Sequence, residues 1–351
     1  MNHSNFNFYD AFDFDDDTPV LAFQVATAVV AEEESNIQGR RTRYRGSIPG
    51  HNIVNRNRKE DLTDEYLRIG ETTAIESLRA FAKAIVEVFG DCYLRAPNEA
   101  DICRLLSIGE QRGFPGMLGS IDCMHWKWEK CPIAWHGMYT GHCREPTIIL
   151  EAVASQDLWI WHAFFGMPGS LNDINVLDRS PIFAALAEGR TAPVNYTING
   201  HEYTMGYYLA DGIYPNWSTF VKTIPRPLGA KRKYFASKQE SARKDVERAF
   251  GVLQSRFAIV RGPVRYWDEE TLAYIMKACI IMHNMIIEDE GAMNLRFDHE
   301  HEVNSFISVS RCEIPELHDF LQTHNRIRDR ATSSQLQEDL IEHLWEQYGN
   351  E

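Results

Sequence analysis

The order of short apolar runs constrains the fold of this 351-residue chain more than any other feature. Runs of this length, bounded by Gly and Pro and rich in β-branched and aromatic residues, are typical of strands. Three of them follow one another closely after residue 106, and a fourth comes later in the chain. The expected strands are Ser120–Trp128, Thr147–Ala154, Leu158–Phe164 and Tyr207–Ala210.

Helical patterns alternate with these strands. Gly166–Gly169 predicts a turn after the third strand, and Ser170–Asp173 fits a capping box that opens a helix toward Leu177. A long helix is expected over Ser237–Phe257, where apolar residues recur at helical spacing, and another over Glu269–Glu288. Three consecutive strands, a helix, a fourth strand and later helices predict an α/β fold with a mixed sheet and flanking helices.

The chain divides into four parts. Residues 1–60 are expected to be a mostly disordered tail, and residues 61–105 a helical region with a Gly70 turn. That region is either a plain helical hairpin or the remnant of a helix-turn-helix. Residues 106–290 hold the α/β domain, and residues 291–351 form an acidic tail with one helix near Ser334–Tyr348.

The net charge of −14 argues against binding of nucleic acid when it is taken for the whole chain, but the charge is unevenly distributed along the sequence. Residues 1–35 carry eight acids and no Lys or Arg, and residues 288–351 have a net charge of −10, which leaves +4 for residues 36–287. Blocks of like charge are usually solvated ends. No apolar run is expected to reach the roughly 18 residues of a membrane helix, so no membrane partner is expected. The seven Cys suggest no disulfide framework.

Isolated acids in apolar surroundings are the strongest chemical signal. Asp122 lies inside the first strand, Asp211 ends the fourth strand, and Glu247 borders the apolar stripe of the long helix. A carboxylate at the end of an apolar strand is costly unless a cation compensates it. Such carboxylates could converge on Mg²⁺, or they could form ordinary ion pairs, Asp122 with a nearby Arg and Glu247 with Arg243.

Basic residues cluster between the second Asp and the end of the long helix. They could neutralise the phosphates of a nucleic acid, with Tyr234 or Phe235 stacking on a base, or they could be a solvated surface. The candidate DNA-contacting residues are Lys231, Arg232, Lys233, Arg243, Lys244 and Arg248.

Soft ligands crowd residues 123–143, but no Cys-x-x-Cys pair occurs among them, so zinc is disfavoured. His125 is expected to be a packed neighbour of the acids rather than a general acid. The tryptophans are expected in the core or an interface rather than on bases. The residues concerned are Cys123, His125, Cys131, His136, His142, Cys143, Trp126, Trp128, Trp135, Trp159 and Trp161.

Five ordered blocks resemble PIF/Harbinger transposases and their domesticated relatives, the Harbinger-derived nucleases, in their plant branch. The resemblance covers about residues 62–290. The blocks are Leu118–Trp128 (LGSIDCMHWKW), Tyr139–Ser155 (YTGHCREPTIILEAVAS), Pro168–Leu177 (PGSLNDINVL), Tyr208–Tyr214 (YLADGIY) and Asp245–Phe257 (DVERAFGVLQSRF).

The resemblance implies an RNase H-like DDE endonuclease domain with Asp122, Asp211 and Glu247 as the catalytic carboxylates. It implies that Asp173 is a further metal ligand, whereas the capping box makes it a helix cap, and both remain open. Two Mg²⁺ or Mn²⁺ ions, DNA as substrate, a Myb/SANT-like accessory protein and a nuclear location, or a cytoplasmic one without that partner, are implied in the same way. The alternative is an inactive domesticated transposase that acts as a nuclear adaptor.

The chain departs from this family before the α/β domain. The family carries a longer helical region with a complete helix-turn-helix, and the first of its helices has no counterpart here. A three-helix unit without one helix buries little apolar surface, so site-specific DNA binding by this chain alone is not expected. The DNA target sequence and the oligomeric state are not predicted by the sequence.

Overall fold

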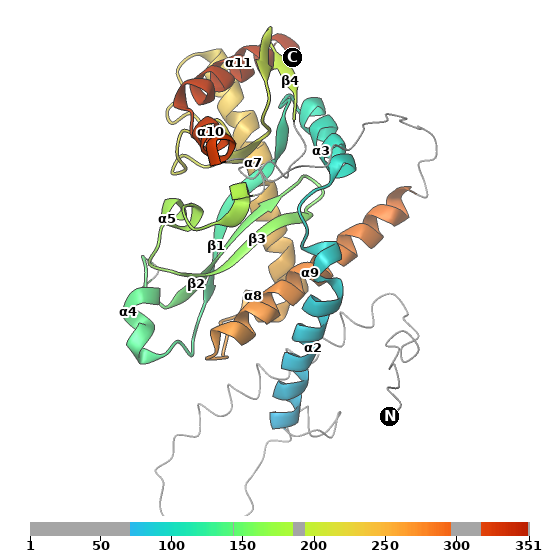
Figure 1. Ribbon diagram of the computed structural model, residues 1–351, viewed down its shortest axis with the longest axis vertical. Helices are drawn as coiled ribbons and strands as arrows, with labels where there is room; N and C mark the ends of the chain where they lie inside the picture. The colour runs from blue at the N-terminus through green and yellow to red at the C-terminus, as the bar shows by residue number, and fades with distance from the viewer. Residues whose placement is uncertain (1–70, 143, 185–193, 296–316, 350–351) are drawn as a thin grey trace, which may run out of the picture.

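A five-stranded mixed sheet forms the centre of the protein (Figure 1). The computed structural model describes residues 71–142, 144–184, 194–295 and 317–349. The strand order is β3-β2-β1-β6-β7, in which β1, β6 and β7 are parallel and β2 is antiparallel to both of its neighbours. The α/β class with a mixed sheet is therefore confirmed. The strands are β1 (Met117–Lys127), β2 (Thr147–Ala154), β3 (Ile160–Pro168), β6 (Tyr207–Ala210) and β7 (Phe220–Lys222).

Helices cover both faces of this sheet. On one face, α7 and α9 pack against the strands, and α2 packs against α9 in the same apolar cluster as Trp126 and Ala152. On the other face, the short α5 packs through Leu177 against Ile121 and Val153. The remaining elements are α2 (Glu71–Tyr93), α3 (Glu99–Gln111), η3 (Ile133–Trp135), α4 (His136–Tyr139), α5 (Asp173–Leu177), η4 (Pro181–Phe183), β4 (Tyr196–Ile198), β5 (His201–Tyr203), α7 (Ala230–Arg256), α8 (Ala258–Arg261), α9 (Glu269–Leu295), α10 (Leu317–Ile327) and α11 (Arg330–Tyr348).

Helix α9 reaches the length and apolarity of a membrane-crossing segment, contrary to the expectation that no run would. Within Glu269–Gly291, an 18-residue segment has a mean hydropathy of 1.2, yet 56% of that segment is buried inside the fold. Ile275, Cys279 and Ile281 of this helix lie in the largest apolar cluster, where they contact neighbouring helices and the sheet. Burial against protein accounts for the apolarity, so α9 is a core helix.

Several boundaries differ from the sequence-based expectation. The third strand continues through Gly166 and Pro168, where a turn was expected, and the backbone turns only after Pro168. The helix expected from Ser237 begins at Ala230, because Gly229 is its N-cap and offers no side-chain signal. The first expected helix, which precedes Gly70, lies outside the described residues.

The C-terminal segment contributes to the folded core, although it was expected to be an acidic tail with one helix. The expected helix is α11, with Leu340 and Leu344 completely buried, and α10 precedes it. These two leucines share an apolar cluster with Phe235 of α7 and Tyr207 of β6. The segment therefore helps to hold α7 on the sheet.

A bulge in β1 sets the register that matters for the acids. The pairing between β1 and β6 shifts between Met117 and Gly119, after which Ser120 pairs with Leu209. Gly119 has a φ of +153°, and a Cβ there would lie 2.7 Å from the Ala154 carbonyl oxygen. Only glycine fits such an approach, and the bulge places Asp122, two residues after Ser120, beside the end of β6.

Candidate active site

Asp122 projects from the middle of β1 toward α7. It shares the face of Ser120, whose hydroxyl accepts a hydrogen bond from the Val246 N–H of α7 at 3.0 Å. Burial is the main cause that raises the pKa of Asp122 to about 6. The nearby carboxylates of Asp173 and Asp211 act in the same direction, while the Cys123 N–H and the Arg243 guanidinium oppose the shift. A carboxyl group that titrates so close to neutral pH is unusual for Asp, and it marks a candidate functional group.

Asp211 follows the last residue of β6, two residues after Leu209, which pairs with Ser120 of β1, and it lies near enough to Asp122 to interact with it. Its Oδ1 accepts a hydrogen bond of 2.8 Å from the Ile213 N–H, which fixes the turn after the strand. Lys222 ends the neighbouring strand β7 and lies near enough to interact with Asp211. Burial lowers the pKa of Lys222, whose ammonium donates to the Tyr214 carbonyl at 2.7 Å. The carboxyl end of β6 thus brings Asp211 near Asp122 of the neighbouring strand, and strand ends of this kind are the usual place for ligands in open α/β sheets.

Glu247 approaches from α7, where Arg243 holds it. The Arg243 Nη1 lies 2.7 Å from Glu247 Oε1 and 3.5 Å from Asp122 Oδ2. The guanidinium therefore bridges two of the predicted catalytic carboxylates. Both ion pairs that the sequence allowed as alternatives are present, and they join the acids of β1 and α7.

Asp173 is the first residue of α5 but does not cap it. Asn172 is the N-cap, and its side chain accepts from the Asn175 N–H, so the capping box expected over Ser170–Asp173 is wrong. Asp173 instead receives a hydrogen bond from the Cys123 thiol, and burial is the main cause that raises its pKa. Because Cys123 follows Asp122 along a strand, Asp173 approaches from the opposite face of the sheet.

The four acids have the donor chemistry of a divalent-cation site. Asp122, Asp173, Asp211 and Glu247 supply only carboxylate oxygens, which Mg²⁺ and Mn²⁺ prefer. A cationic group, the guanidinium of Arg243, already lies between two of them. Among the described residues, however, no three His, Cys, Asp or Glu side chains lie close enough together to hold a metal ion. The donor chemistry fits the metal, and the side chains would have to converge, with Arg243 moving aside.

The predicted DNA-contacting residues lie along α7, and most of them are paired with acids. Lys231 and Arg232, expected in a loop, lie in the first turn of α7 and form ion pairs with Glu342 and Glu338 of α11. Lys244 pairs with Glu240 along the helix, and Arg248 pairs with the buried Asp245. Lys233 is exposed, and Arg243 is 14% exposed within the acidic site.

The aromatic residues near this basic strip are structural. Phe235 is completely buried and packs against Phe114, so the alternative in which this residue stacks on a base is wrong. Tyr234 meets Trp345 of α11 edge to face. Four of the five tryptophans expected in the core or an interface are buried, whereas Trp135 is 39% exposed. The buried four are Trp126, Trp128, Trp159 and Trp161.

The histidines and cysteines of residues 123–142 have local partners. His125 Nδ1 lies 2.9 Å from the Thr147 hydroxyl, and its ring meets His142 edge to face. Burial and the neighbouring His142 lower the pKa of His125. Cys131 is buried and its carbonyl contacts His136. Cys143 lies outside the described residues.

Sequence reasoning missed two neighbours of the acids. Lys222 ends a strand of only three residues, which carries too little pattern to detect. Glu151 of β2 is completely buried, and one of its oxygens has no hydrogen-bond partner while the other contacts His162. It pairs across the ladder with Cys123, so it lies near Asp173. The signal for Glu151 was present in the sequence, because a single acid interrupts an otherwise apolar strand.

Similarity to known proteins places this site in a family. Residues 91–294 match the family model of the plant transposon protein, and because this match covers more than half of the chain, the chain belongs to that family. The protein ALP1-like of Arabidopsis thaliana is 24% identical over 203 residues, which cover 55% of this chain and 48% of that protein. The chain thus spans about half the length of this curated relative. No solved structure matches the chain.

Proposed function

We propose that this protein is a metal-dependent DDE nuclease, transposase-like and of PIF/Harbinger descent, that cleaves DNA phosphodiester bonds. The observation that carries the proposal is the placement of Asp122 beside Asp211, with Glu247 facing them from α7. The strand order β3-β2-β1-β6-β7, with the first Asp on the central strand, supports an RNase H-like fold. Membership of the plant transposon family supports the same function.

The residues of the site have distinct roles in this proposal. Asp122, Asp211 and Glu247, with Asp173, would hold two Mg²⁺ or Mn²⁺ ions. Such ions lower the pKa of an attacking water or 3′-hydroxyl and offset charge on the leaving oxygen. Partial burial of Asp122 lowers the dielectric constant around its own carboxylate and strengthens the electrostatic interactions of that group.

DNA would lie along the exposed side of α7. Lys233 and Lys244 face solvent there, and Lys231, Arg232 and Arg248 would contact phosphates by exchanging their present acidic partners. Each such exchange replaces a carboxylate partner by a phosphate partner, so each residue adds little to the free energy of DNA binding. Binding of DNA is therefore expected to be weak and strongly dependent on salt.

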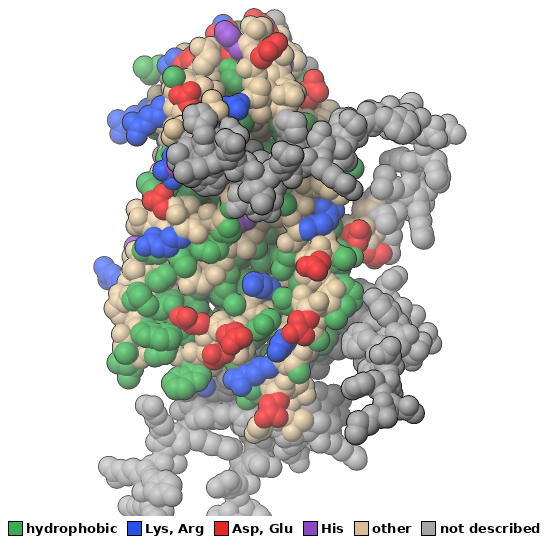
Figure 2. All heavy atoms as spheres, viewed as in Figure 1, with side chains coloured by type: hydrophobic (Ala, Val, Ile, Leu, Met, Phe, Trp, Pro, Cys, Tyr) green, Lys and Arg blue, Asp and Glu red, His purple; other side chains and the backbone are tan. Residues whose placement is uncertain are grey.

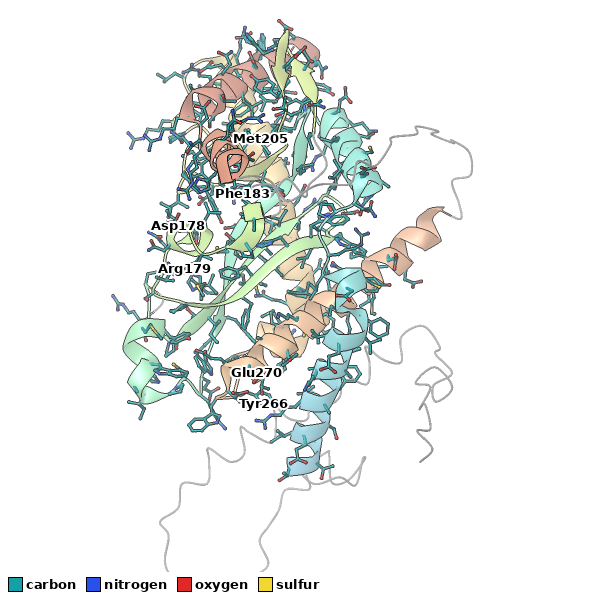
Figure 3. All side chains as sticks on the ribbon, viewed as in Figure 1. Asp178, Arg179, Phe183, Met205, Tyr266 and Glu270 are labelled. Carbon is teal, nitrogen blue, oxygen red and sulfur yellow. The ribbon has the colours of Figure 1, made fainter. Side chains whose placement is uncertain are left out.

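A nicking assay tests the enzymatic function. Purified protein with Mn²⁺ is expected to convert supercoiled plasmid DNA to the open circular form, and Asp122→Ala is expected to abolish this conversion. Asp178→Ala is the matched control, because Asp178 is exposed at the end of α5, as the side chains in Figure 3 show. Equal nicking by the Asp122 variant and the unchanged protein would show that the cleavage comes from a contaminant or another site.

A non-enzymatic adaptor is the second candidate, and one observation favours it. Arg243 already neutralises Asp122 and Glu247, as an internal ion pair in an inactive scaffold would. Titration calorimetry separates the two functions: the nuclease is expected to bind Mn²⁺ at millimolar concentration or below, whereas the adaptor is expected not to bind it.

An accessory protein and a nuclear location complete the proposal. The family resemblance implies a two-component system in which a Myb/SANT-like protein supplies DNA binding and nuclear entry. A pull-down with the tagged full chain from nuclear extract is expected to recover such a protein. Recovery of DNA-bound chain without any Myb/SANT-like partner would contradict this part of the proposal.

A further inference from the structure

Arg243 is enclosed by the acids of the candidate site. Its guanidinium contacts Glu247 at 2.7 Å and Asp122 at 3.5 Å, and its side chain is only 14% exposed. The facing elements β1 and α7 each present a carboxylate to it, and Asp211 at the end of β6 lies within electrostatic range of Asp122. The other nearby cation, Lys222, is directed to the Tyr214 carbonyl. Arg243 is therefore the cation that neutralises the α7 side of the site.

We propose that Arg243 is an internal counter-ion that competes with the divalent cation for Asp122 and Glu247. This inference rests on the proposed metal-dependent function. A guanidinium N–H that occupies a Glu247 oxygen at 2.7 Å leaves no room for a cation on the same lone pair. The positive charge of the guanidinium also repels a divalent cation at the same carboxylates, so the metal binds most favourably in the state in which Arg243 has left.

This competition has a thermodynamic consequence. The apparent affinity for the metal is the intrinsic affinity multiplied by the fraction of molecules in which Arg243 has left. A guanidinium released next to Lys244 faces the proposed path of DNA, where a phosphate can accept its paired N–H groups. DNA therefore stabilises the released state, and DNA and metal bind with positive coupling.

Calorimetric titration of MnCl₂ into the full chain tests the proposal. Arg243→Gln is expected to bind Mn²⁺ roughly tenfold more tightly than the unchanged protein, because a competing charge within a few ångströms is worth more than the 1.4 kcal/mol of a tenfold change. Arg261→Gln, which makes the same chemical change at an exposed residue of α8, is the matched control and is expected to leave the affinity for Mn²⁺ unchanged. Addition of a short DNA duplex is expected to tighten Mn²⁺ binding to the unchanged protein more than to Arg243→Gln.

The outcomes separate this inference from the proposed function. Weaker Mn²⁺ binding by Arg243→Gln than by the unchanged protein would overturn the inference alone, because it would show that Arg243 only orients Glu247 for the metal. Absence of binding to both proteins at millimolar Mn²⁺ would overturn the inference and the metal-dependent function together. If Arg243→Gln fails to fold, Arg243→Met serves instead, because Met keeps an unbranched apolar stem without the charge, and it is expected to bind Mn²⁺ more tightly than the unchanged protein.

Discussion

Replacement of Asp122 by Asn is expected to stabilise the metal-free protein at pH 7. Burial raises the pKa of Asp122 from 3.8 to about 6, so the folded protein holds this carboxylate in its charged form at a cost. A tenfold change in acidity corresponds to about 1.4 kcal/mol, so the cost at pH 7 is at most about 3 kcal/mol. An amide has the shape of the acid without the charge, and it removes this cost.

The stability of the unchanged protein depends on pH because the pKa of Asp122 is higher in the folded than in the unfolded state. Between pH 4 and pH 6 the unfolded chain loses the Asp122 proton while the folded protein keeps it, so the stability of the unchanged protein falls as the pH rises through this window. Below pH 4 the acid is protonated in both states. The stability difference between Asp122→Asn and the unchanged protein is therefore expected to be near zero at low pH and largest at pH 7.

Urea denaturation in EDTA, at low pH and at pH 7, measures this difference. The exposed Asp178→Asn is the control for the same chemical change without burial. A loss of stability for Asp122→Asn at pH 7 would refute the reasoning, because it would show that the ion pair with Arg243 contributes more than burial costs. In saturating Mn²⁺ the order is expected to reverse, since only the unchanged protein gains stability from the ion.

Three further predictions concern the framework around the site. Leu344→Ala is expected to lower the free energy of unfolding by about 2–5 kcal/mol in urea denaturation, because Leu344 is completely buried in the cluster that joins α11 to α7. A change below about 1 kcal/mol would mean that the fold does not depend on α11. Arg112 forms an ion pair with Asp245, whose side chain is only 3% exposed and also pairs with Arg248. Arg112→Ala is therefore expected to lower the free energy of unfolding by about 2–4 kcal/mol, and no change would show that the pair between Arg112 and Asp245 is not formed. Lys233→Ala is expected to weaken DNA binding in fluorescence anisotropy more than Lys231→Ala, since Lys231 is already paired with Glu342; the reverse order would place the DNA elsewhere.

The central strands could be predicted because each is a short apolar run rich in β-branched residues and bounded by polar or turn residues. The β2 bounds coincide with the expected Thr147–Ala154, a run buried at every position. The end of β3 could not be predicted, because Gly166 and Pro168 are turn residues in most contexts. They are tolerated here since β3 is an edge strand, where Pro leaves no ladder partner unsatisfied. The three-residue strands β4, β5 and β7 are too short to show a period.

The acids of the candidate site were found by sequence, whereas their partners were not. Asp122, Asp211 and Glu247 stand out as single acids beside apolar residues. The fold brings Asp211 at the end of β6 near Asp122, and Arg243 joins Glu247 of α7 to Asp122. The ion pairs of Lys231 and Arg232 join α7 to a helix more than a hundred residues later, and no local pattern reports such a contact. The sequence therefore located the basic residues of α7 but could not show which of them are paired with acids.

Two other surfaces lie away from the acids. A cavity of about 520 Å³ lies beside β3 and is lined by Phe183 and Met205, which Figure 3 labels. Its lining also includes Val194, which follows residues 185–193 that lie outside the described part of the chain. Exposed Ile133 and Met138 belong to the apolar end of the molecule around α4, where Figure 2 shows green side chains gathered. Neither surface includes the acids of β1, β6 and α7.

Anomalous diffraction from crystals soaked in Mn²⁺ tests the central claim most directly, because it locates the ion rather than its effects. The account predicts a peak bound by Asp122 and Asp211, with the Arg243 guanidinium turned away from Glu247. A map without a peak at these carboxylates, in which Arg243 still bridges Asp122 and Glu247 in Mn²⁺-saturated crystals, would contradict it.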